Sequence, residues 1–293
     1  MNNLPKYPIL SLLNIGFSEL NANWNWKNVQ SPFARIYYVV EGHAQTYIKQ
    51  KRYLLKPGNL YLIPPFTLHD DECDSPFSLF YIHFYEEIFN KESIFEQFSY
   101  PIEIGAGELD ILLIKRLYEI NPNRQLKNID PQMYDNTPGF KESQAANRKI
   151  PTYMAVESQG ILSFLISRFM RGATLKSKYK DIRVYKCLQY IHENIRNTIS
   201  LNQLADISCT SEDHLTRLFK NQTQYTPVKY INLKKLERAQ LLLLTTDMPI
   251  HEIAMELSFD NVSYFNRLFK NQTNMTPGKY RIVFRQQRNQ GEG

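Results

Sequence analysis

Cysteine is scarce in this sequence, and its scarcity limits the chemistry that the chain can perform. The 293 residues contain three cysteines, Cys73, Cys187 and Cys209, which lie far apart and form no CxxC pair. A disulfide framework, a zinc site or a redox couple would need closely spaced pairs, so none of these is expected. Free thiols suit a reducing compartment, which predicts a cytoplasmic protein.

Long apolar runs are also missing. No stretch approaches the ~20 residues of a membrane span, and the first thirty residues lack the basic start and apolar middle of a signal peptide. We therefore expect a soluble chain with no membrane partner. Since 43% of the residues are hydrophobic and 13% aromatic, the chain can bury more than one core, and its length suits two domains.

The first part of the chain has no excess of positive over negative residues, and the positive charge is concentrated in the second part. Residues 1–175 hold 17 Lys and Arg against 18 Asp and Glu, whereas residues 176–293 hold 18 against 11. Because neutralisation of phosphate supplies most non-specific DNA affinity, this imbalance favours DNA binding by residues 176–293. A solvated basic face would give the same count, so charge alone leaves both interpretations open.

One short segment occurs twice in the basic part of the chain, residues 176–293. The heptapeptide RLFKNQT occupies Arg217–Thr223 and again Arg267–Thr273, and the Thr226-Pro227 pair that follows the first copy recurs as Thr276-Pro277. The stretch before each copy has the same arrangement: an apolar helical pattern, then a short break, then a second helix. Two helix-turn-helix units of this kind would place two short helices in neighbouring major grooves of DNA.

Capping residues define the helices of this part. Ser200 and Gln203 form an S-x-x-Q capping box, and Thr226 caps a helix that starts at Pro227 and runs to about Thr245. At 1.5 Å per residue that helix is roughly 28 Å long, close to the ~34 Å between major-groove openings on one face of DNA. The sequence therefore predicts a rigid spacer between the two units.

The motifs of this region also resemble a known family. SLNQLA, HLTRLFK, LERAQLLLL, IHEIAMELSF, YFNRLFK and MTPGKYR follow one another between Tyr185 and Tyr280. Their order and spacing resemble the double helix-turn-helix DNA-binding domain of AraC/XylS-type transcription regulators. The periodicity assigns many apolar side chains of these motifs to the core rather than to DNA.

The resemblance implies which side chains contact DNA. They fall on the exposed face of the two reading helices, at Asp213, Thr216 and Arg217 in the first unit, and at Val262, Ser263, Tyr264, Asn266 and Arg267 in the second. Arginine can bond the O6/N7 edge of guanine and asparagine the N6/N7 edge of adenine, whereas Asp213 could only accept from cytosine. Lys220 and Lys270 are expected at phosphates, with a solvated surface position as the alternative. A surface salt bridge is the alternative role for either arginine.

The chain departs from this family at its turns. Family members usually carry glycine in each helix-turn-helix turn and after each reading helix, where this chain has Cys209, Ser258, Gln224 and Asn274. Of these residue types, only asparagine readily tolerates the left-handed conformation. These departures leave the exact geometry of the turns open, but not the fold.

Residues 33–85 change to period-two alternation and a β-rich composition, interrupted by Gly42, Pro57-Gly58, Pro64-Pro65 and Pro76. Short strands at close spacing predict an antiparallel sandwich or small barrel. The order EGHAQTYI, LKPGNLYLIPP, His69 and a later aromatic strand is similar to the cupin-like sensory domain of many AraC-type regulators.

The resemblance to a cupin-like domain implies an effector inside the barrel. Matching by strand order suggests a candidate set of effector-binding residues: Arg35, Tyr37, Glu41, Asp71, Tyr81 and His83. Each could instead be a rim, turn or packed residue. The HxH motif of metal-binding cupins is missing, so we expect no metal, no other cofactor and no catalytic residue.

Two amphipathic stretches, Leu109–Ile120 and Met154–Met170, follow the strands, with a polar segment from Asn121 to Ile150 between them that is typical of a long loop. Residues 172–180 form the expected linker. The helices after the barrel often pair two chains in this family, and such a seam would use Leu162, Leu165, Ile166 and Phe169. Packing on the chain's own barrel explains the same residues equally well.

The expected fold is α+β, with a cupin-like antiparallel β barrel and flanking helices in residues 1–175 and an all-α double helix-turn-helix domain in residues 176–293. The leading hypothesis is a sequence-specific transcription regulator, more often an activator among relatives, controlled by a small-molecule effector such as a sugar or by dimerisation. Its expected partners are promoter DNA, RNA polymerase and a second copy of the chain. The alternative is a cupin-type isomerase or dioxygenase with an accessory helical domain.

Overall fold

The computed structural model describes residues 8–87, 93–122, 124–126, 151–176 and 181–283, and these form two compact units. The first, here called the sheet unit, takes its described residues from the chain up to Glu87 and from Phe98 to Thr174. The second, the helical unit, consists of residues 93–97 and of the described residues from Leu175 to Val283. Each unit is described below by itself.

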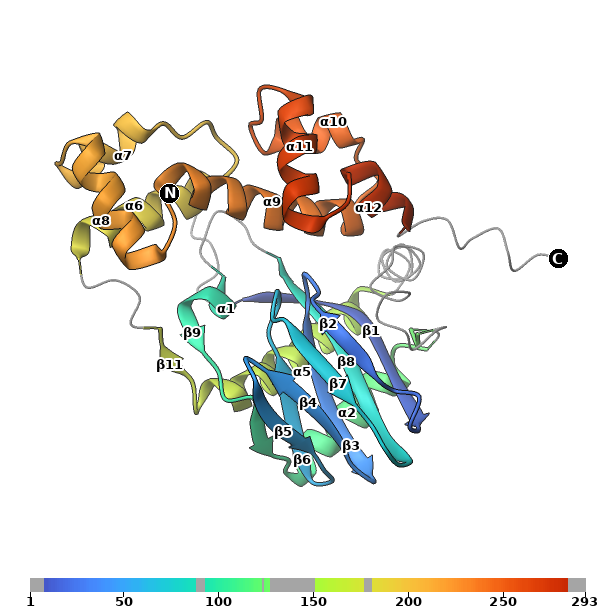
Figure 1. The fold of residues 1–293 in the computed structure, drawn as a ribbon. Coiled ribbons are helices and arrows are strands. Elements are labelled where there is room, and N and C mark those ends of the chain that lie inside the picture. Colours follow the sequence, from blue (N-terminus) through green and yellow to red (C-terminus); the bar gives the residue numbers. More distant parts are fainter. Residues whose placement is uncertain (1–7, 88–92, 123, 127–150, 177–180, 284–293) are drawn as a thin grey trace. The chain divides into compact units, whose positions relative to one another are not determined.

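Two antiparallel sheets build the sheet unit (Figure 1). One has the strand order β1-β8-β3-β6-β10, with bounds β1 (Ile9–Leu20), β8 (Phe77–Glu87), β3 (Ala34–Glu41), β6 (Asn59–Ile63) and β10 (Glu103–Gly105). The other has the order β2-β7-β4-β5, with bounds β2 (Trp26–Val29), β7 (His69–Glu72), β4 (Ala44–Ile48) and β5 (Lys51–Leu55). Short strands β9 (Phe98–Ser99) and β11 (Thr174–Leu175) pair separately.

The β fold predicted for residues 33–85 is confirmed, but the first two strands were not predicted. Strand β1 is buried along most of both faces, so its sequence ILSLLNIGFSEL shows no clean alternation of apolar and polar residues. One predicted turn needs its glycine. Gly42 has φ of +73°, and a Cβ atom there would lie 2.3 Å from the Pro76 carbonyl oxygen.

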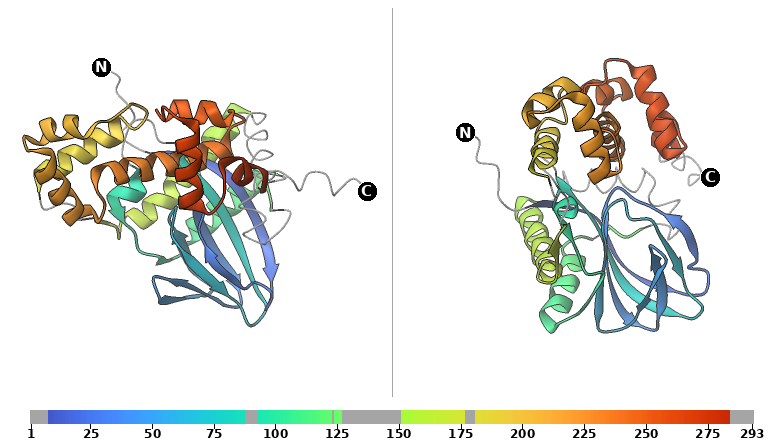
Figure 2. Two further views of the ribbon diagram at one scale, coloured as in Figure 1. Left: turned by 45° about the horizontal axis from the view of Figure 1, so that its top comes forward. Right: turned by 60° about the vertical axis from the view of Figure 1, so that its left-hand side comes forward.

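Helices α2 (Glu108–Glu119) and α5 (Thr152–Met170) pack beside each other and against β1, on one side of the sheets (Figure 2). The four side chains proposed as a seam between two chains, Leu162, Leu165, Ile166 and Phe169, are all at most 1% exposed. Packing within the chain therefore explains them, and the seam interpretation is wrong for these residues. The apolar side chains that α2 and α5 do expose are Leu109, Leu112, Tyr153 and Val156. Most of the predicted loop, residues 127–150, lies outside the described residues.

The helical unit contains two helix-turn-helix pairs joined by a long helix (Figure 1). Its helices are α6 (Ile182–Glu193), α7 (Leu201–Ser208), α8 (Glu212–Thr223), α9 (Pro227–Thr245), α10 (Ile250–Glu256), α11 (Val262–Thr273) and α12 (Pro277–Val283). Ser200 and Gln203 form the predicted capping box, and Thr226 caps α9. Among the described residues, no helix is long and apolar enough to cross a membrane.

The four turns that lack glycine nevertheless adopt the left-handed conformation. Their φ values are +51° at Cys209, +51° at Ser258, +68° at Gln224 and +59° at Asn274. The backbone geometry that the sequence left open is therefore left-handed at all four positions. Both helix-turn-helix turns close with the same bond, from Thr210 N to the carbonyl of Ala205 and from Phe259 N to that of Ala254, as in a Schellman motif. These bonds and the packed helices hold a conformation that costs about 1 to 2 kcal/mol for a residue with a Cβ atom.

Helix α1 (Ile94–Gln97) belongs to the helical unit although the sequence places it between β8 and β9. Its Glu96 lies 3.0 Å from the ammonium of Lys234 on α9 and 3.6 Å from Nε2 of His192 on α6. Lys234 keeps its charge because Glu96 and Glu237 flank it: burial opposes ionisation, but the two carboxylates raise the pKa of Lys234 above its ordinary value. The segment from the first half of the chain thus completes the core around α6 and α9.

Candidate nucleic-acid interface and internal pocket

The two reading helices, α8 and α11, repeat the same pattern of burial. Leu215 and Phe219 are buried in α8, as are Phe265 and Phe269 at the matching positions of α11. The ten predicted DNA-contact residues lie on the remaining faces. Asp213, Arg217, Lys220, Ser263, Tyr264, Arg267 and Lys270 are exposed, and Thr216, Val262 and Asn266 are half-buried. The periodic apolar side chains therefore pack each helix against its unit, and equivalent polar residues remain on the surface of both helices.

Arg217 and Arg267 occupy equivalent positions on this surface. Neither guanidinium forms a salt bridge with a carboxylate of the described residues, so the salt-bridge alternative finds no partner there. The Arg267 guanidinium lies 5.5 Å from the centre of the Tyr264 ring, and the Tyr264 hydroxyl accepts a hydrogen bond from Asn232 of α9. Asn266 is less ready for base reading, because its Oδ1 atom is inaccessible to solvent and would have to rotate outward.

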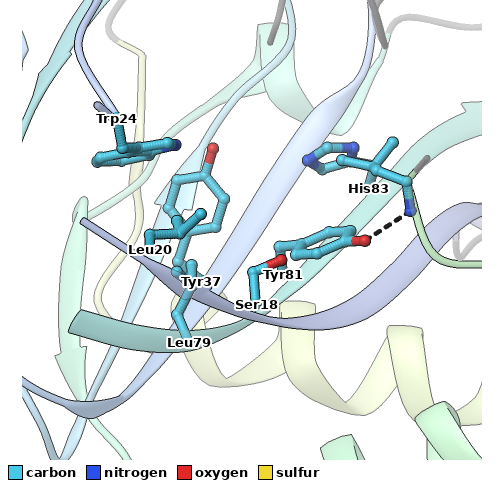
Figure 3. A pocket seen from close by; sticks show the side chains of 8 residues that line it. Ser18, Leu20, Trp24, Tyr37, Leu79, Tyr81 and His83 are labelled. Carbon is cyan, nitrogen blue, oxygen red and sulfur yellow. Dashed lines mark hydrogen bonds between the residues drawn. The ribbon is translucent and has the colours of Figure 1, made fainter. Parts of the chain in front are cut away.

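A small aromatic pocket lies inside the sheet unit (Figure 3). Its volume is about 20 Å³, and its lining residues are Ser18, Leu20, Trp24, Tyr37, Leu79, Tyr81, His83 and Leu126. The Tyr81 hydroxyl accepts a hydrogen bond of 2.6 Å from the Leu126 backbone N–H, and burial raises the pKa of Tyr81 to about 12. Gly16 makes room for this hydroxyl, because a Cβ atom there would lie 2.2 Å from it.

A second group of buried side chains, here called the polar cluster, consists of Arg35, His69, Asp71 and His83, each 1% exposed. Arg35 on β3 and His83 on β8 are cross-strand partners. His69 Nε2 lies 3.7 Å from Asp71 Oδ2, and Arg35 donates a 2.6 Å hydrogen bond to the Ser31 hydroxyl. The sheets therefore enclose one arginine, one carboxyl and two imidazoles, and His83 joins this cluster to the aromatic pocket.

Burial sets the protonation of the polar cluster. It lowers the pKa of His69 to about 3 and that of His83 well below its ordinary value, and the positive charge of Arg35 lowers both further. Burial raises the pKa of Asp71 to about 7, although Thr46 and Arg35 oppose that rise. At neutral pH both imidazoles are therefore uncharged. Within the described part of the chain, Asp71 Oδ1 and His69 Nε2 have no hydrogen-bond partner, which is costly for buried polar atoms.

The structure brings five of the six predicted effector residues into the interior of the sheet unit. Tyr37, Tyr81 and His83 line the pocket, and Arg35 and Asp71 belong to the polar cluster. Glu41 is exposed at the end of β3 and lines no part of the pocket. Trp24 in the pocket and His69 in the polar cluster lie beside these residues but were not among the predicted ones. No group of three His, Cys, Asp or Glu residues in the described ranges is arranged to hold a metal ion.

Comparison with known protein families gives one match in each unit. Residues 21–103 match the family described as "AraC-like ligand binding domain", and residues 204–282 match the family described as "Helix-turn-helix domain". The first match includes the polar cluster and most of the pocket. The second covers both reading helices and α9.

Individual relatives are similar over different lengths. The chain is 24% identical over 237 residues to "Uncharacterized HTH-type transcriptional regulator YfiF" of Bacillus subtilis, covering 78% of this chain and 70% of that protein. It is 39% identical over 77 residues to "XylDLEGF operon transcriptional activator 2" of Pseudomonas putida, covering 25% of this chain and 49% of that protein, so it spans about half of that activator. The solved structure of ToxT from Vibrio cholerae covers 94% of this chain and 98% of its own, with 12% identity and a TM-score of 0.47.

Proposed function

Since the chain belongs to the AraC/XylS-type transcription regulators, we propose that α8 and α11 bind promoter DNA and that the interior of the sheet unit binds a small-molecule effector. The observation that carries the DNA proposal is the repeated surface of the two reading helices, with Arg217 and Arg267 unpaired by any described carboxylate at equivalent positions. We assign the functional division to residues 1–175 and 176–293.

The DNA contacts follow from side-chain chemistry. Arg217, Arg267 and Asn266 are proposed to read bases, and Lys220 and Lys270 to neutralise phosphates. The remaining predicted contacts, Asp213, Thr216, Val262, Ser263 and Tyr264, lie on the same two faces. Activation is the proposed outcome, in keeping with the name of the Pseudomonas putida relative, and RNA polymerase is a further proposed partner.

Selection from a randomised pool of duplexes by the full chain tests the DNA proposal. We expect enrichment of a site with two conserved segments about 10 base pairs apart, one for each reading helix. Enrichment of one segment only would show that a single unit reads sequence. A pool that stays random after repeated selection would contradict sequence-specific binding.

The proposed effector is a small polar molecule such as a sugar. Arg35, Asp71, His69 and His83 supply hydrogen-bond donors and acceptors, while Trp24, Tyr37 and Tyr81 supply aromatic surface, the combination typical of small-ligand sites. A volume of about 20 Å³ holds about one water, so effector binding requires the pocket to widen. Glu41 is the weakest candidate because it is exposed.

Thermal unfolding of the full chain across a panel of sugars and other metabolites tests this proposal. A ligand at a hundred times its Kd stabilises the folded chain by about 2.7 kcal/mol. The test variant is Tyr81→Phe, which removes the hydroxyl that lies in the pocket. The matched control is Tyr53→Phe on β5, which makes the same change outside the pocket lining. An effector whose stabilisation is unchanged in Tyr81→Phe does not use this pocket hydroxyl.

Three further features complete the proposal. We propose a homodimer, for which the exposed Leu109, Leu112, Tyr153 and Val156 of α2 and α5 offer an apolar surface. We also propose a cytoplasmic location and no enzymatic activity. Sedimentation of the full chain with and without Leu112→Ser tests the first, and metal analysis of the purified protein tests the isomerase or dioxygenase alternative.

A further inference from the structure

Lys235 occupies an unusual place for a lysine, near the middle of α9 with only 4% of its surface exposed. Burying an ammonium group costs several kcal/mol unless other groups replace its water. Here the replacements are two backbone carbonyls, those of Asn197 and Ser258, each 3.2 Å from the Lys235 Nζ atom. The Phe259 ring lies 5.4 Å from the same atom.

These two carbonyls belong to different helix-turn-helix units. Asn197 lies in the connection between α6 and α7 of the first unit, and Ser258 forms the turn between α10 and α11 of the second. Two more contacts join the same segments directly. The Ser258 hydroxyl donates to the carbonyl of Arg196, and the Arg196 guanidinium lies 3.0 Å from the Glu256 carboxylate. We call Arg196, Asn197, Lys235, Glu256 and Ser258 the clasp.

A comparison of the two repeats shows that the clasp is specific to the second turn. Cys209 holds the position in the first turn that Ser258 holds in the second, with the same left-handed backbone. Cys209 is an exposed free thiol, whereas Ser258 and its neighbours bond across to the other unit. The two turns share their conformation and their closing backbone bond, but only Ser258 also bonds to the other unit. These additional bonds of Ser258 are therefore not needed to form a turn of this kind.

Helix α9 alone cannot fix every aspect of the arrangement of the two reading helices. Its length sets their separation, but each unit also has to be held against rotation about the helix axis. Contacts away from that axis resist such rotation. The clasp provides them, and a cleft of about 370 Å³ beside it is lined by Thr198 and Ile199 from the first unit and by residues 258–261 and 264 from the second.

We propose that Lys235 is a positioning residue, whose clasp fixes the angle between α8 and α11 and so determines the DNA spacing that both can read together. This inference rests on the proposed DNA binding and deepens it. The lowered pKa of Lys235, about 8 because of burial, agrees with an amine that is kept inside despite its cost. Lys235 itself need not touch DNA.

The test uses the full chain and a duplex enriched from the randomised pool, alongside the same duplex with five base pairs inserted between its two segments. Lys235→Met removes the donors but keeps an unbranched apolar stem. Lys235→Arg restores donors and charge. Lys186→Met, on the exposed surface of α6, is the matched control, because it makes the same substitution and the same charge change outside the clasp.

For the unaltered chain, we expect the insertion to weaken binding by about tenfold or more, because the DNA must bend or twist to meet both helices. Lys235→Met should bind the original duplex about tenfold more weakly than the unaltered chain does. The insertion should lower the affinity of this variant by less than about a further threefold. Lys186→Met should keep the full insertion penalty, and Lys235→Arg should regain most of it. A purely structural role would lower both affinities together and leave the penalty unchanged.

An insertion penalty in folded Lys235→Met equal to that of the unaltered chain would overturn the proposal. If circular dichroism shows that Lys235→Met is unfolded, Ser258→Ala takes its place, since it removes the hydroxyl bond to Arg196 and leaves Lys235 in position. A full penalty in Ser258→Ala would then overturn the clasp. Failure to enrich any duplex would instead contradict the proposed DNA binding, on which the clasp depends.

Discussion

Arg217 and Arg267 allow the most direct comparison of the two repeats, because each is the first residue of the same heptapeptide. We predict that Arg217→Ala and Arg267→Ala each weaken binding to the selected duplex by about 1 to 3 kcal/mol, because a bidentate bond to guanine is lost. Titration of the full chain with selected and random duplexes measures the effect.

The lysines of the same helices provide the control for this prediction. Lys220→Ala and Lys270→Ala should weaken binding to both duplexes to a similar degree, because phosphate contacts carry no sequence information. Equal losses on selected and random DNA in the arginine variants would reassign Arg217 and Arg267 to phosphate contacts.

Asp71 leads to a prediction about pH. Its pKa in the folded chain is about 7, above the ordinary value of 3.8, so the folded state holds the proton more tightly than the unfolded state. The stabilisation is fully present below pH 4 and is lost as the pH rises through 7. The unfolding free energy of the unaltered chain relative to Asp71→Asn should therefore fall by on the order of 2 to 4 kcal/mol between pH 4 and 8.

Denaturant titrations followed by tryptophan fluorescence measure this difference in the sheet unit, because both tryptophans, Trp24 and Trp26, lie there. The comparison with Asp71→Asn matters because His69 and His83 contribute in the opposite direction: their lowered pKa values favour folding as the pH rises. Taking the difference cancels their contribution to the extent that the substitution leaves them unchanged. A difference that is flat with pH would show that folding does not raise the pKa of Asp71.

At the scale of elements, the left-handed turns offer a matched pair of substitutions. Gln224 and Asn274 end the two reading helices with φ of +68° and +59°, but asparagine tolerates this conformation better than glutamine. We predict that Gln224→Gly raises the stability of the helical unit by about 0.5 to 1 kcal/mol, because relief of strain exceeds the added entropy of the unfolded chain. Asn274→Gly should change it by less than about half of that.

Thermal unfolding followed by circular dichroism at 222 nm reports on the helices and checks this prediction. Equal effects of the two substitutions would mean that side-chain strain in the left-handed region does not limit stability here. A loss of stability in Gln224→Gly would point instead to a stabilising contact of the glutamine side chain.

The helices could be predicted because their signals are local. Thr226 and Pro227 mark the start of α9, and the end predicted near Thr245 agrees with the structure. Strand β1 could not be predicted, since burial on both faces removes the alternation that marks a strand. The geometry of the left-handed turns could not be predicted either, because cysteine, serine and glutamine do not indicate that conformation and it is held by backbone bonds to the preceding helices.

The candidate sites were predictable to a similar degree. Exposed faces of α8 and α11 follow from helical periodicity, whereas the polar cluster depends on which strands face each other across two sheets. His69 in the segment HDDE carries no mark that separates it from a turn residue. Lys235 was missed for a related reason: a lysine in a long helix is normally solvated, and only the approach of two distant carbonyls makes it a buried one.

At the scale of the whole molecule, the charge difference between residues 1–175 and 176–293 predicts a strong salt dependence of DNA binding. We expect the logarithm of the association constant of the full chain to fall linearly with the logarithm of salt concentration, with a slope of about −0.9 for each phosphate neutralised. Lys220→Ala should reduce the magnitude of the slope by about 1.

Affinity measured on the selected duplex between 50 and 200 mM salt, a range over which several phosphate contacts have large effects, checks this expectation. Binding that stayed constant over the range would contradict an interface based on phosphate. A slope unchanged in Lys220→Ala would place that lysine away from the backbone of the DNA.

Helix α1 has a consequence for biosynthesis. Gln97 leaves the ribosome about 85 residues before Ile182, the first residue of α6, which at 5 to 20 residues per second corresponds to a delay of roughly 4 to 17 s. During that interval Glu96 has neither Lys234 nor His192 to pair with. The described residues of the sheet unit end at Thr174, so its core can form while the nascent chain still lacks the partners of α1. Any recombinant fragment that starts at residue 176 repeats this condition permanently, because it contains Lys234 without Glu96.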